Sequence, residues 1–208
     1  MSSDMSTPMI PEAGRATEAP RAEIAVQGAS PPISLWGLIR EDYRAHGRDW
    51  TKPGFRAMAV YRFGVWRMGM RPKLVRGPFS IVYRWMFRRV RNRYGIELPY
   101  SAKIGRRVIV EHQSGIVVHG NAEIGDDSII RQGVTLGNKT MDRPADAPVL
   151  GRGVNVGAGA KILGAVRIGD CAQIGANAVV LSDVPAGMVA VGVPARVLAG
   201  RRGKEGNL

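Results

Sequence analysis

From Ile104 to Val180 an aliphatic residue returns at almost every sixth position. These positions are Ile104, Val110, Ile116, Ile124, Ile130, Leu136, Leu150, Val156, Ile162, Ile168, Ile174 and Val180. The fourth residue after each of them is usually small or β-branched. A period of six fits neither an α-helix nor a single amphipathic strand, so it indicates a repeat. Hexapeptide repeats build a parallel β-helix, in which the aliphatic side chains of successive coils stack into a core.

The six-residue period is interrupted twice. The step from Ile116 to Ile124 is eight residues, which indicates a two-residue insertion that contains His119. The step from Leu136 to Leu150 is fourteen residues, so residues 138–148 are expected to leave the coil as a loop. Insertions in repeat proteins map to loops, often on the binding face. Neutral surface decoration is the alternative, but the length and charged residues of the longer insertion favour a functional edge.

The chain before the repeat has the capping and turn residues expected of a small α-helical region. Three helices are expected between capping and turn residues: Ser34 to Arg48, Phe55 to Met68, and Phe79 to Tyr94. The predicted organisation is a basic helical region over residues 33–95 and a β-helix domain over residues 96–198. Residues 1–32, rich in Ser, Pro, Ala and Gly, are expected to be disordered, and residues 199–208 to form a basic tail.

Positive charge is concentrated in the helical region. The chain has a formal net charge of +13, and the stretch from Arg62 to Arg93 contains Arg, Lys and interleaved aromatic residues but no acidic residue. One interpretation is an amphipathic surface that rests on anionic lipid. The other, which we favour from sequence, is a solvated helix face whose aromatic residues pack on the β-helix. No nucleic-acid partner is expected, because no recognised binding module is present.

The single cysteine and the absence of membrane signals indicate the compartment. Cys171 cannot form an intrachain disulfide, and we expect it to be a small packed residue. No apolar stretch is long enough to span a bilayer, and the N-terminus lacks a secretory signal. These features predict a cytoplasmic protein, which the lipid interpretation would place at the inner face of the membrane.

His112 is the candidate catalytic residue. A histidine titrates near neutral pH, which suits the removal of a proton from an attacking hydroxyl group. Glu111 precedes it and is expected to orient the imidazole or to contact the acceptor. The alternative is an ordinary His–carboxylate pair on a surface coil, which is common. No spacing of Cys and His suggests a metal site, so no metal is expected.

Several stretches of the chain together resemble the serine acetyltransferase family of acetyl-CoA-dependent hexapeptide acyltransferases. They are Arg48-Asp49, Phe55–Trp66, Glu111–Val118, Gly133–Gly137, Gly157–Gly164 and Gly192–Arg196. In combination they are specific. The resemblance implies a left-handed parallel β-helix, acetyl-CoA as co-substrate, and a homotrimer or a dimer of trimers. In that family the active sites lie between neighbouring β-helices.

The resemblance also implies roles for particular residues. His112 would be the general base, and Glu111 would take the place of the family's aspartate beside that histidine. Asp49 matches an aspartate of the helical region that reaches the acceptor pocket. The residues implied to bind coenzyme A are Ala158, Ala176, Gly137 and Lys161.

The loop over residues 138–148 departs from the family pattern. Serine acetyltransferases carry an Arg-His pair there that helps to hold the serine carboxylate, whereas this loop offers Arg143 and no histidine. The departure resembles a second branch, the acetyltransferases of exopolysaccharide (colanic-acid-type) biosynthesis. The sequence thus predicts an O-acetyltransferase whose acceptor is L-serine or a saccharide unit. N-acetylation of an amino sugar and a non-catalytic β-helix scaffold are the alternatives.

Overall fold

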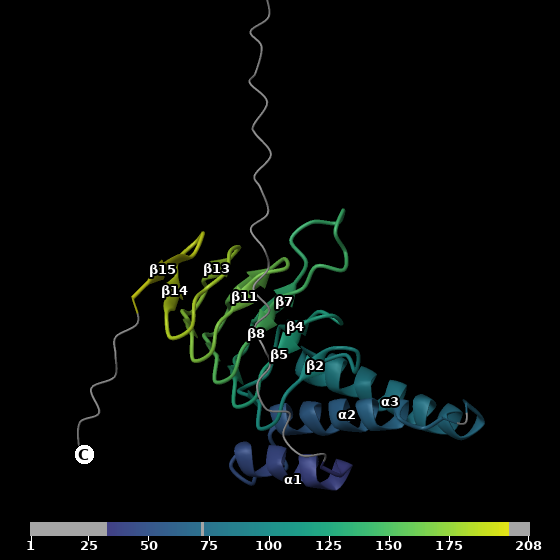
Figure 1. The fold of residues 1–208 in the computed structure, drawn as a ribbon. Coiled ribbons are helices and arrows are strands. Elements are labelled where there is room, and N and C mark those ends of the chain that lie inside the picture. The colour runs from purple at the N-terminus through teal and green to yellow at the C-terminus, as the bar shows by residue number, and fades with distance from the viewer. Residues whose placement is uncertain (1–32, 72, 200–208) are drawn as a thin grey trace, which may run out of the picture. The chain divides into compact units, whose positions relative to one another are not determined.

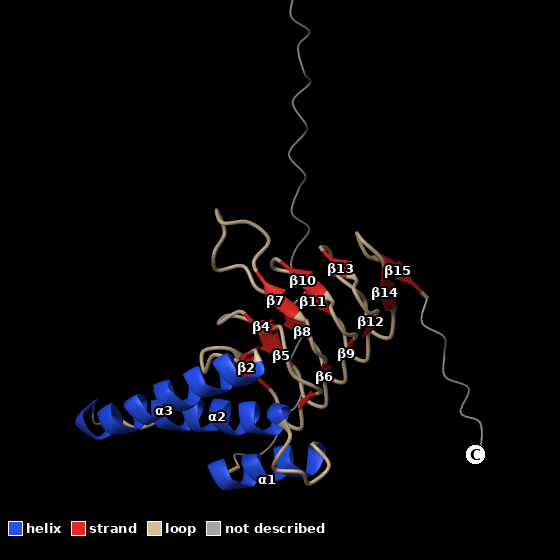
Figure 2. Cartoon of the chain, turned by 180° about the vertical axis from the view of Figure 1, so that it is seen from behind, coloured by secondary structure: helices blue, strands red, loops and turns tan. Residues whose placement is uncertain are grey.

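Three helices precede a β-helix in a computed structural model that describes residues 33–71 and 73–199 (Figure 1). The helices are α1 (Leu35–Ala45), α2 (Pro53–Met68) and α3 (Lys73–Tyr94). They gather at the end of the β-helix where its first coil lies, as the view from behind also shows (Figure 2). The expectations for residues 1–32 and 200–208 lie outside the described residues.

The strands wind into coils with three faces, and each face is a sheet built from successive coils. The first face contains β1 (Ile96–Glu97), β4 (Ile116–Val118), β7 (Thr135–Gly137), β10 (Lys161–Leu163) and β13 (Val179–Val180). The second contains β2 (Lys103–Ile104), β5 (Glu123–Ile124), β8 (Val149–Leu150) and β11 (Arg167–Ile168). The third contains β3 (Ile109–Val110), β6 (Ile129–Ile130), β9 (Asn155–Val156), β12 (Gln173–Ile174), β14 (Val189–Val191) and β15 (Arg196–Leu198).

The predicted architecture, a left-handed parallel β-helix preceded by a small helical region, is confirmed. Paired strands are parallel except for β14 and β15, which are antiparallel. All the aliphatic residues that defined the six-residue period are at most 7% exposed, so they form the core as predicted. Leu98, six residues before Ile104, is 4% exposed and extends the same stack by one position.

The two-residue insertion does not lie where the sequence placed it. Val118, rather than Ile116, stands level with the aliphatic position of the next coil. The step of eight residues therefore runs from Val110 to Val118. The extra residues fall in the turn between β3 and β4, which we call the His112 turn (residues 111–115), and the insertion predicted around His119 is wrong. The sequence did not decide between the two registers because both candidates are aliphatic and both are buried.

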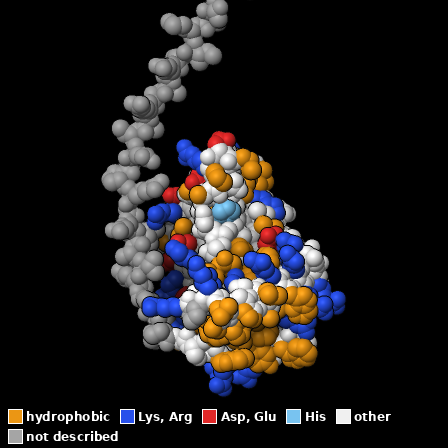
Figure 3. All heavy atoms as spheres, turned by 90° about the vertical axis from the view of Figure 1, so that its right-hand side faces the viewer, with side chains coloured by type: hydrophobic (Ala, Val, Ile, Leu, Met, Phe, Trp, Pro, Cys, Tyr) orange, Lys and Arg blue, Asp and Glu red, His pale blue; other side chains and the backbone are white. Residues whose placement is uncertain are grey.

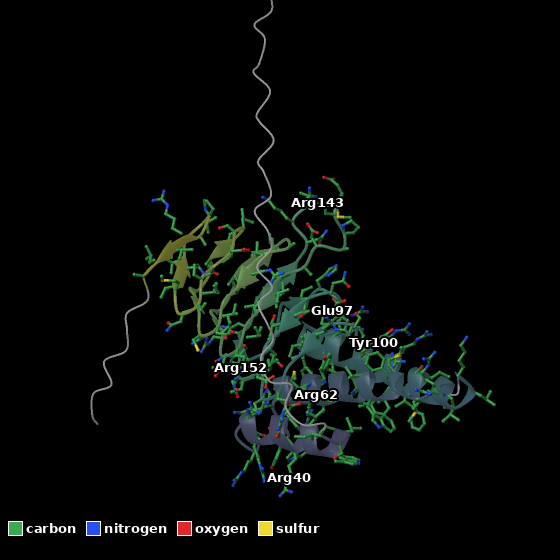
Figure 4. All side chains as sticks on the ribbon, in the orientation of Figure 1. Arg40, Arg62, Glu97, Tyr100, Arg143 and Arg152 are labelled. Carbon is green, nitrogen blue, oxygen red and sulfur yellow. The ribbon has the colours of Figure 1, made fainter. Side chains whose placement is uncertain are left out.

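Side chains of the helices cover the exposed edge of the first coil. The Tyr61 hydroxyl donates to the carbonyl of Ala102 (2.8 Å) and accepts from the amide of Ile104 (2.9 Å). Arg62 donates to the carbonyl of Ile104 (2.9 Å) and forms a buried ion pair with Asp42 of α1, with Nε 2.8 Å from Oδ2 (Figure 4). These bonds occupy backbone groups that a preceding coil would otherwise bind, so α1 and α2 cap the β-helix.

The helix boundaries differ in part from those expected. Ser34 caps α1 as predicted, because its Oγ accepts from the amide of Gly37 (3.2 Å). The predicted break at Gly77-Pro78 is wrong, since α3 runs through it. Pro78 cannot donate to the carbonyl of Leu74, but Leu74 is exposed, so water can satisfy that carbonyl. Over residues 33–71 and 73–199, no helix combines the length and the apolar character needed to cross a bilayer.

Cys171 is exposed, so the prediction that it is a packed residue is wrong. It occupies a corner of the coil in the left-handed conformation (φ 56°). The core position of that repeat belongs instead to its neighbour Ala172, which is fully buried.

Candidate active site

The His112 turn has a backbone unlike the equivalent corners of the other coils. Those corners each contain one residue in the left-handed conformation, Gly133, Gly159 or Asn177. The His112 turn contains three: His112 (φ 64°), Ser114 (φ 89°) and Gly115 (φ 68°). Gly115 lies against Gly133, so it corresponds to the single left-handed residue of the other corners. The left-handed residues His112 and Ser114 belong to the two-residue insertion. A left-handed residue other than glycine costs about 1 kcal/mol or more. The surrounding structure therefore holds His112 in a strained and exposed position.

A buried histidine anchors the turn to the helical region. His46 is 2% exposed; its Nδ1 bonds the carbonyl of Asp42 (2.7 Å) and its Nε2 bonds the amide of Val110 (3.1 Å). The amide can only donate, so Nε2 accepts, and the proton of the neutral ring lies on Nδ1. His46 thereby connects α1 to the residue that lies two positions before His112. This role could not be predicted from the local sequence, because it depends on a long-range contact.

This anchor makes stability depend on pH. Burial lowers the pKa of His46 below its ordinary value of 6.5. Below pH 6.5 the unfolded chain binds a proton that the folded chain excludes, so we expect the free energy of unfolding to decrease as the pH falls from 6.5. Each unit between the two pKa values is worth about 1.4 kcal/mol. Denaturant titrations across pH 5–8 would measure this decrease. His46→Gln should flatten the profile, whereas His119→Gln should not; equal slopes in all three proteins would contradict the assignment.

Helix α2 supplies a second contact to the same residue. A Cβ atom on Gly54, in the first turn of α2, would lie 1.9 Å from the carbonyl oxygen of Val110. Only glycine allows the helix to approach the strand so closely. On the far side of the turn, the amide of Ser114 donates to the carbonyl of Tyr94 (2.7 Å) at the end of α3. Helices thus hold the His112 turn at both ends.

Glu111 is held by the next coil. Its carboxylate forms an ion pair with Arg131 (Nε–Oε2 2.9 Å), and Arg131 also donates to the side-chain oxygen of Asn155 one coil further on. Among the described residues no hydrogen bond joins Glu111 to His112, so the expected orientation of the imidazole by this carboxylate is not seen in the single chain. Sequence reasoning missed Arg131, although Glu111 and Arg131 each directly follow paired strands and stack for that reason.

Asp49 lies in the connection between α1 and α2. Its carboxylate accepts from the amide (2.8 Å) and the hydroxyl (2.5 Å) of Thr51, and these bonds lower its pKa. Both ends of this short connection, His46 and Gly54, contact Val110. The fold therefore brings Asp49 and the His112 turn to the same end of the β-helix.

The remaining candidates fall at two different corners of the coils. Ala158 and Ala176 follow strands of the third face, as does the His112 turn, so all three lie along one corner of the β-helix, with the corner after β6 between the His112 turn and Ala158. Lys161 begins β10, and its ammonium group donates to the carbonyl of Gly133 at that same corner. Gly137 ends β7 at the opposite end of the first face, where the long loop begins.

The excursion loop (residues 138–148) projects from that second corner, with Arg143 near its tip (Figure 4). The side-chain amide of Asn121 donates to the carbonyl of Ala145 (3.1 Å) and ties the loop to the adjacent coil. Arg143 is exposed, and its carbonyl accepts from the amide of Asp146 (3.1 Å). Within one chain the structure therefore separates Arg143 from His112 by the width of the first face.

Comparison with known proteins gives consistent matches. A family model described as "Bacterial transferase hexapeptide (six repeats)" matches residues 147–182. A serine acetyltransferase of Helicobacter pylori (strain J99) is 40% identical over 169 residues, which cover 79% of this chain and 94% of the relative. The soybean serine acetyltransferase apoenzyme is 33% identical with a TM-score of 0.68, covering 79% of this chain and 69% of that chain. The Brucella abortus serine acetyltransferase in complex with coenzyme A is 29% identical with a TM-score of 0.67, covering 78% and 67%.

Proposed function

Because the chain belongs to the serine acetyltransferase family and is an acyltransferase, we propose that it transfers the acetyl group of acetyl-CoA to the hydroxyl group of L-serine. The observation that carries this proposal is the match to nearly the whole length of a serine acetyltransferase. The relatives described above are all serine acetyltransferases, and they give no support to a saccharide acceptor.

His112 would act as the general base. Its imidazole takes the proton of the acceptor hydroxyl while the hydroxyl oxygen forms a bond to the thioester carbonyl carbon. The tetrahedral intermediate then collapses, the carbon–sulfur bond breaks, and the imidazolium returns the proton to the departing thiolate. The strained, exposed backbone at His112 supports this role, because such strain is retained where function requires it. No acyl-enzyme is needed.

The corner of the β-helix that carries His112 also carries small residues that would line a coenzyme A groove. Ala158 and Ala176 occupy successive coils there, and the neighbouring positions Gly157, Gly159 and Gly175 leave it without bulky side chains. A pantetheine arm can then approach the backbone closely. Lys161 at this corner, and Gly137 of a neighbouring β-helix, would complete the contacts to coenzyme A, whose thioester supplies the activated acetyl group.

The His112 turn and the excursion loop lie at separate corners of one chain, and this separation supports an active site shared between two chains. In a trimer, the His112 turn of one β-helix would meet the excursion loop of its neighbour, which brings the base and Arg143 together. We expect sedimentation equilibrium at micromolar concentration to give three times the chain mass of 22.5 kDa, or a multiple of that trimer. A stable monomer with full activity would contradict the shared site.

The acceptor is tested directly by acetyl transfer. The unmodified protein should release coenzyme A from acetyl-CoA when L-serine is present at millimolar concentration, and mass spectrometry should identify O-acetylserine. A nucleotide sugar, an amino sugar and a polysaccharide repeat unit serve as parallel acceptors. Faster release of coenzyme A with one of these compounds would identify that compound, rather than serine, as the acceptor. No release with serine or with any of these compounds would favour a non-catalytic scaffold.

Arg143 is the cation of the excursion loop that we expect to bind the serine carboxylate. A guanidinium group can donate two parallel hydrogen bonds to a carboxylate. Arg143→Ala should therefore raise the KM for serine about tenfold or more, because a charge-assisted hydrogen bond is lost, and it should change kcat much less. Lys139→Ala, in the same loop, is the matched control. A serine KM unchanged by Arg143→Ala would exclude this contact.

A further inference from the structure

Helix α3 has two apolar faces, and the second is unexplained by the fold. The first packs on α2 and the β-helix and contains Phe79, Tyr83, Met86, Val90 and Tyr94. The second, which we call the outer stripe, contains Leu74, Pro78, Ile81 and Trp85 at spacings of four, three and four. Ile81 and Trp85 each lie two residues from Tyr83, and two residues turn a helix by about 200°. The outer stripe therefore lies opposite the packed face.

The outer stripe is open to solvent in the described part of the chain. Leu74 is 90% exposed, Ile81 70% and Trp85 64%. The interpretation favoured from sequence, in which the aromatic residues pack on the β-helix, holds for Tyr83 but is wrong for Trp85. Figure 3 shows apolar side chains gathered over the helices with Lys and Arg around them. Clustered apolar side chains of this kind mark an interaction site.

Cations border the outer stripe, most of them beyond its C-terminal end. Lys73, Arg84, Arg88, Arg89, Arg91 and Arg93 all belong to α3, which contains no acidic residue. The guanidinium of Arg89 lies over the Trp85 ring, 5.9 Å from its centroid, and both residues line a shallow hollow with Arg88 and Arg93. An exposed apolar stripe bordered by basic residues and carrying a tryptophan is the pattern of a helix that lies in a membrane interface.

A second hollow beside α3 has uncompensated positive charge. Its lining includes Arg67, Arg76 and Arg84 together with Ser80, Tyr83 and Tyr100, and no carboxylate. Arg67 is 6% exposed, lies between the rings of Tyr83 and Tyr100, and donates to Ser80 (2.8 Å). Its Nε is buried without a partner, and no acidic residue of the described chain pairs with it. Because Tyr83 lines it, this hollow lies on the packed side of α3; it adds to the positive charge of the helix but is not part of the outer stripe.

We propose that α3 binds the surface of an anionic phospholipid bilayer through the outer stripe. Leu74, Ile81 and Trp85 enter the region between headgroups and acyl chains, and the flanking arginines contact lipid phosphates. The charge of the helix selects this occupant, since a second copy of α3 would bring the same cations together without an acidic partner.

Vesicle sedimentation with the full chain tests the proposal. The protein should bind vesicles of 30% phosphatidylglycerol in phosphatidylcholine and not vesicles of phosphatidylcholine alone, and added salt should weaken binding. The double variant Ile81→Glu, Trp85→Glu should bind at least tenfold more weakly. Arg88→Gln and Arg89→Gln should each weaken binding about fivefold, the worth of one basic residue near an anionic surface.

Matched controls lie at the opposite end of the β-helix, in β15. Leu198→Glu and Arg196→Gln change the same kinds of exposed residue there and should bind anionic vesicles as the unmodified protein does (Figure 1). Failure of the unmodified protein to bind anionic vesicles would overturn the proposal. So would an outer-stripe variant that binds vesicles normally but sediments as a smaller oligomer, because the stripe would then be a contact between copies. Acetyl transfer measured in parallel reports on the proposed function separately.

Discussion

Replacing His112 with alanine should lower kcat by ~10²–10⁴-fold, the usual effect of losing a general base. The side chain is exposed, so the variant should fold, and calorimetry should show unchanged binding of acetyl-CoA. Steady-state rates with serine at saturation measure the effect. His119→Ala is the matched control, because His119 lies in the same coil and its ring accepts from the amide of its near neighbour Asn121 (3.2 Å). Turnover at the unmodified rate in a folded His112→Ala protein would rule out this base.

Gly54→Ala should reduce activity from a position that touches no substrate. The added methyl group would overlap the carbonyl oxygen of Val110, a backbone atom whose residue is also bound by His46. The Val110 backbone must move, and it carries the His112 turn with it. A displacement of about 1 Å at a catalytic group can cost ~10²-fold in rate. We therefore expect kcat to fall ~10–10²-fold, with the KM for acetyl-CoA nearly unchanged.

The stability of the same variant provides a check. Overpacking should lower the free energy of unfolding by about 1–3 kcal/mol, as measured by denaturant titration. Gly77→Ala is the matched control: it is also a helical glycine, but a Cβ there meets no atom within 4 Å. A Cβ on the residue before Pro78 disfavours the helical conformation, so no gain in stability is expected, but kcat should be unchanged. Equal kinetics in the two variants would show that Gly54 does not position the turn.

The six-residue period was enough to predict a parallel β-helix, because every repeat position that it identified lies in the core; the left-handed winding came from the family resemblance. The register around the His112 turn was not predictable in the same way. Ile116 and Val118 satisfy the hydrophobic pattern equally, and only the pairing of β4 with β7 distinguishes them. The corrected register strengthens the functional argument, since both interruptions of the period now coincide with candidate site residues, His112 and Arg143.

The contacts that support the candidate site could not be predicted from the sequence. His46 and Gly54 contact Val110, which lies about sixty residues later in the chain, and no local sequence pattern predicts such contacts. The break predicted at Gly77-Pro78 failed for a local reason: proline is tolerated where the carbonyl that it leaves unpaired faces water. The exposure of Trp85 could not be foreseen either, because α3 is apolar on two faces and the sequence does not show which one packs.

The cap over the first coil protects the chain as well as the His112 turn. Tyr61, Arg62 and His46 bind backbone groups at the edges of β2 and β3, which would otherwise be free to template another strand. Damage to the cap would expose these edges at one end of every β-helix. Head-to-tail stacking of chains into open fibres would then compete with the proposed trimer, because a contact of this kind has no symmetry that stops its growth.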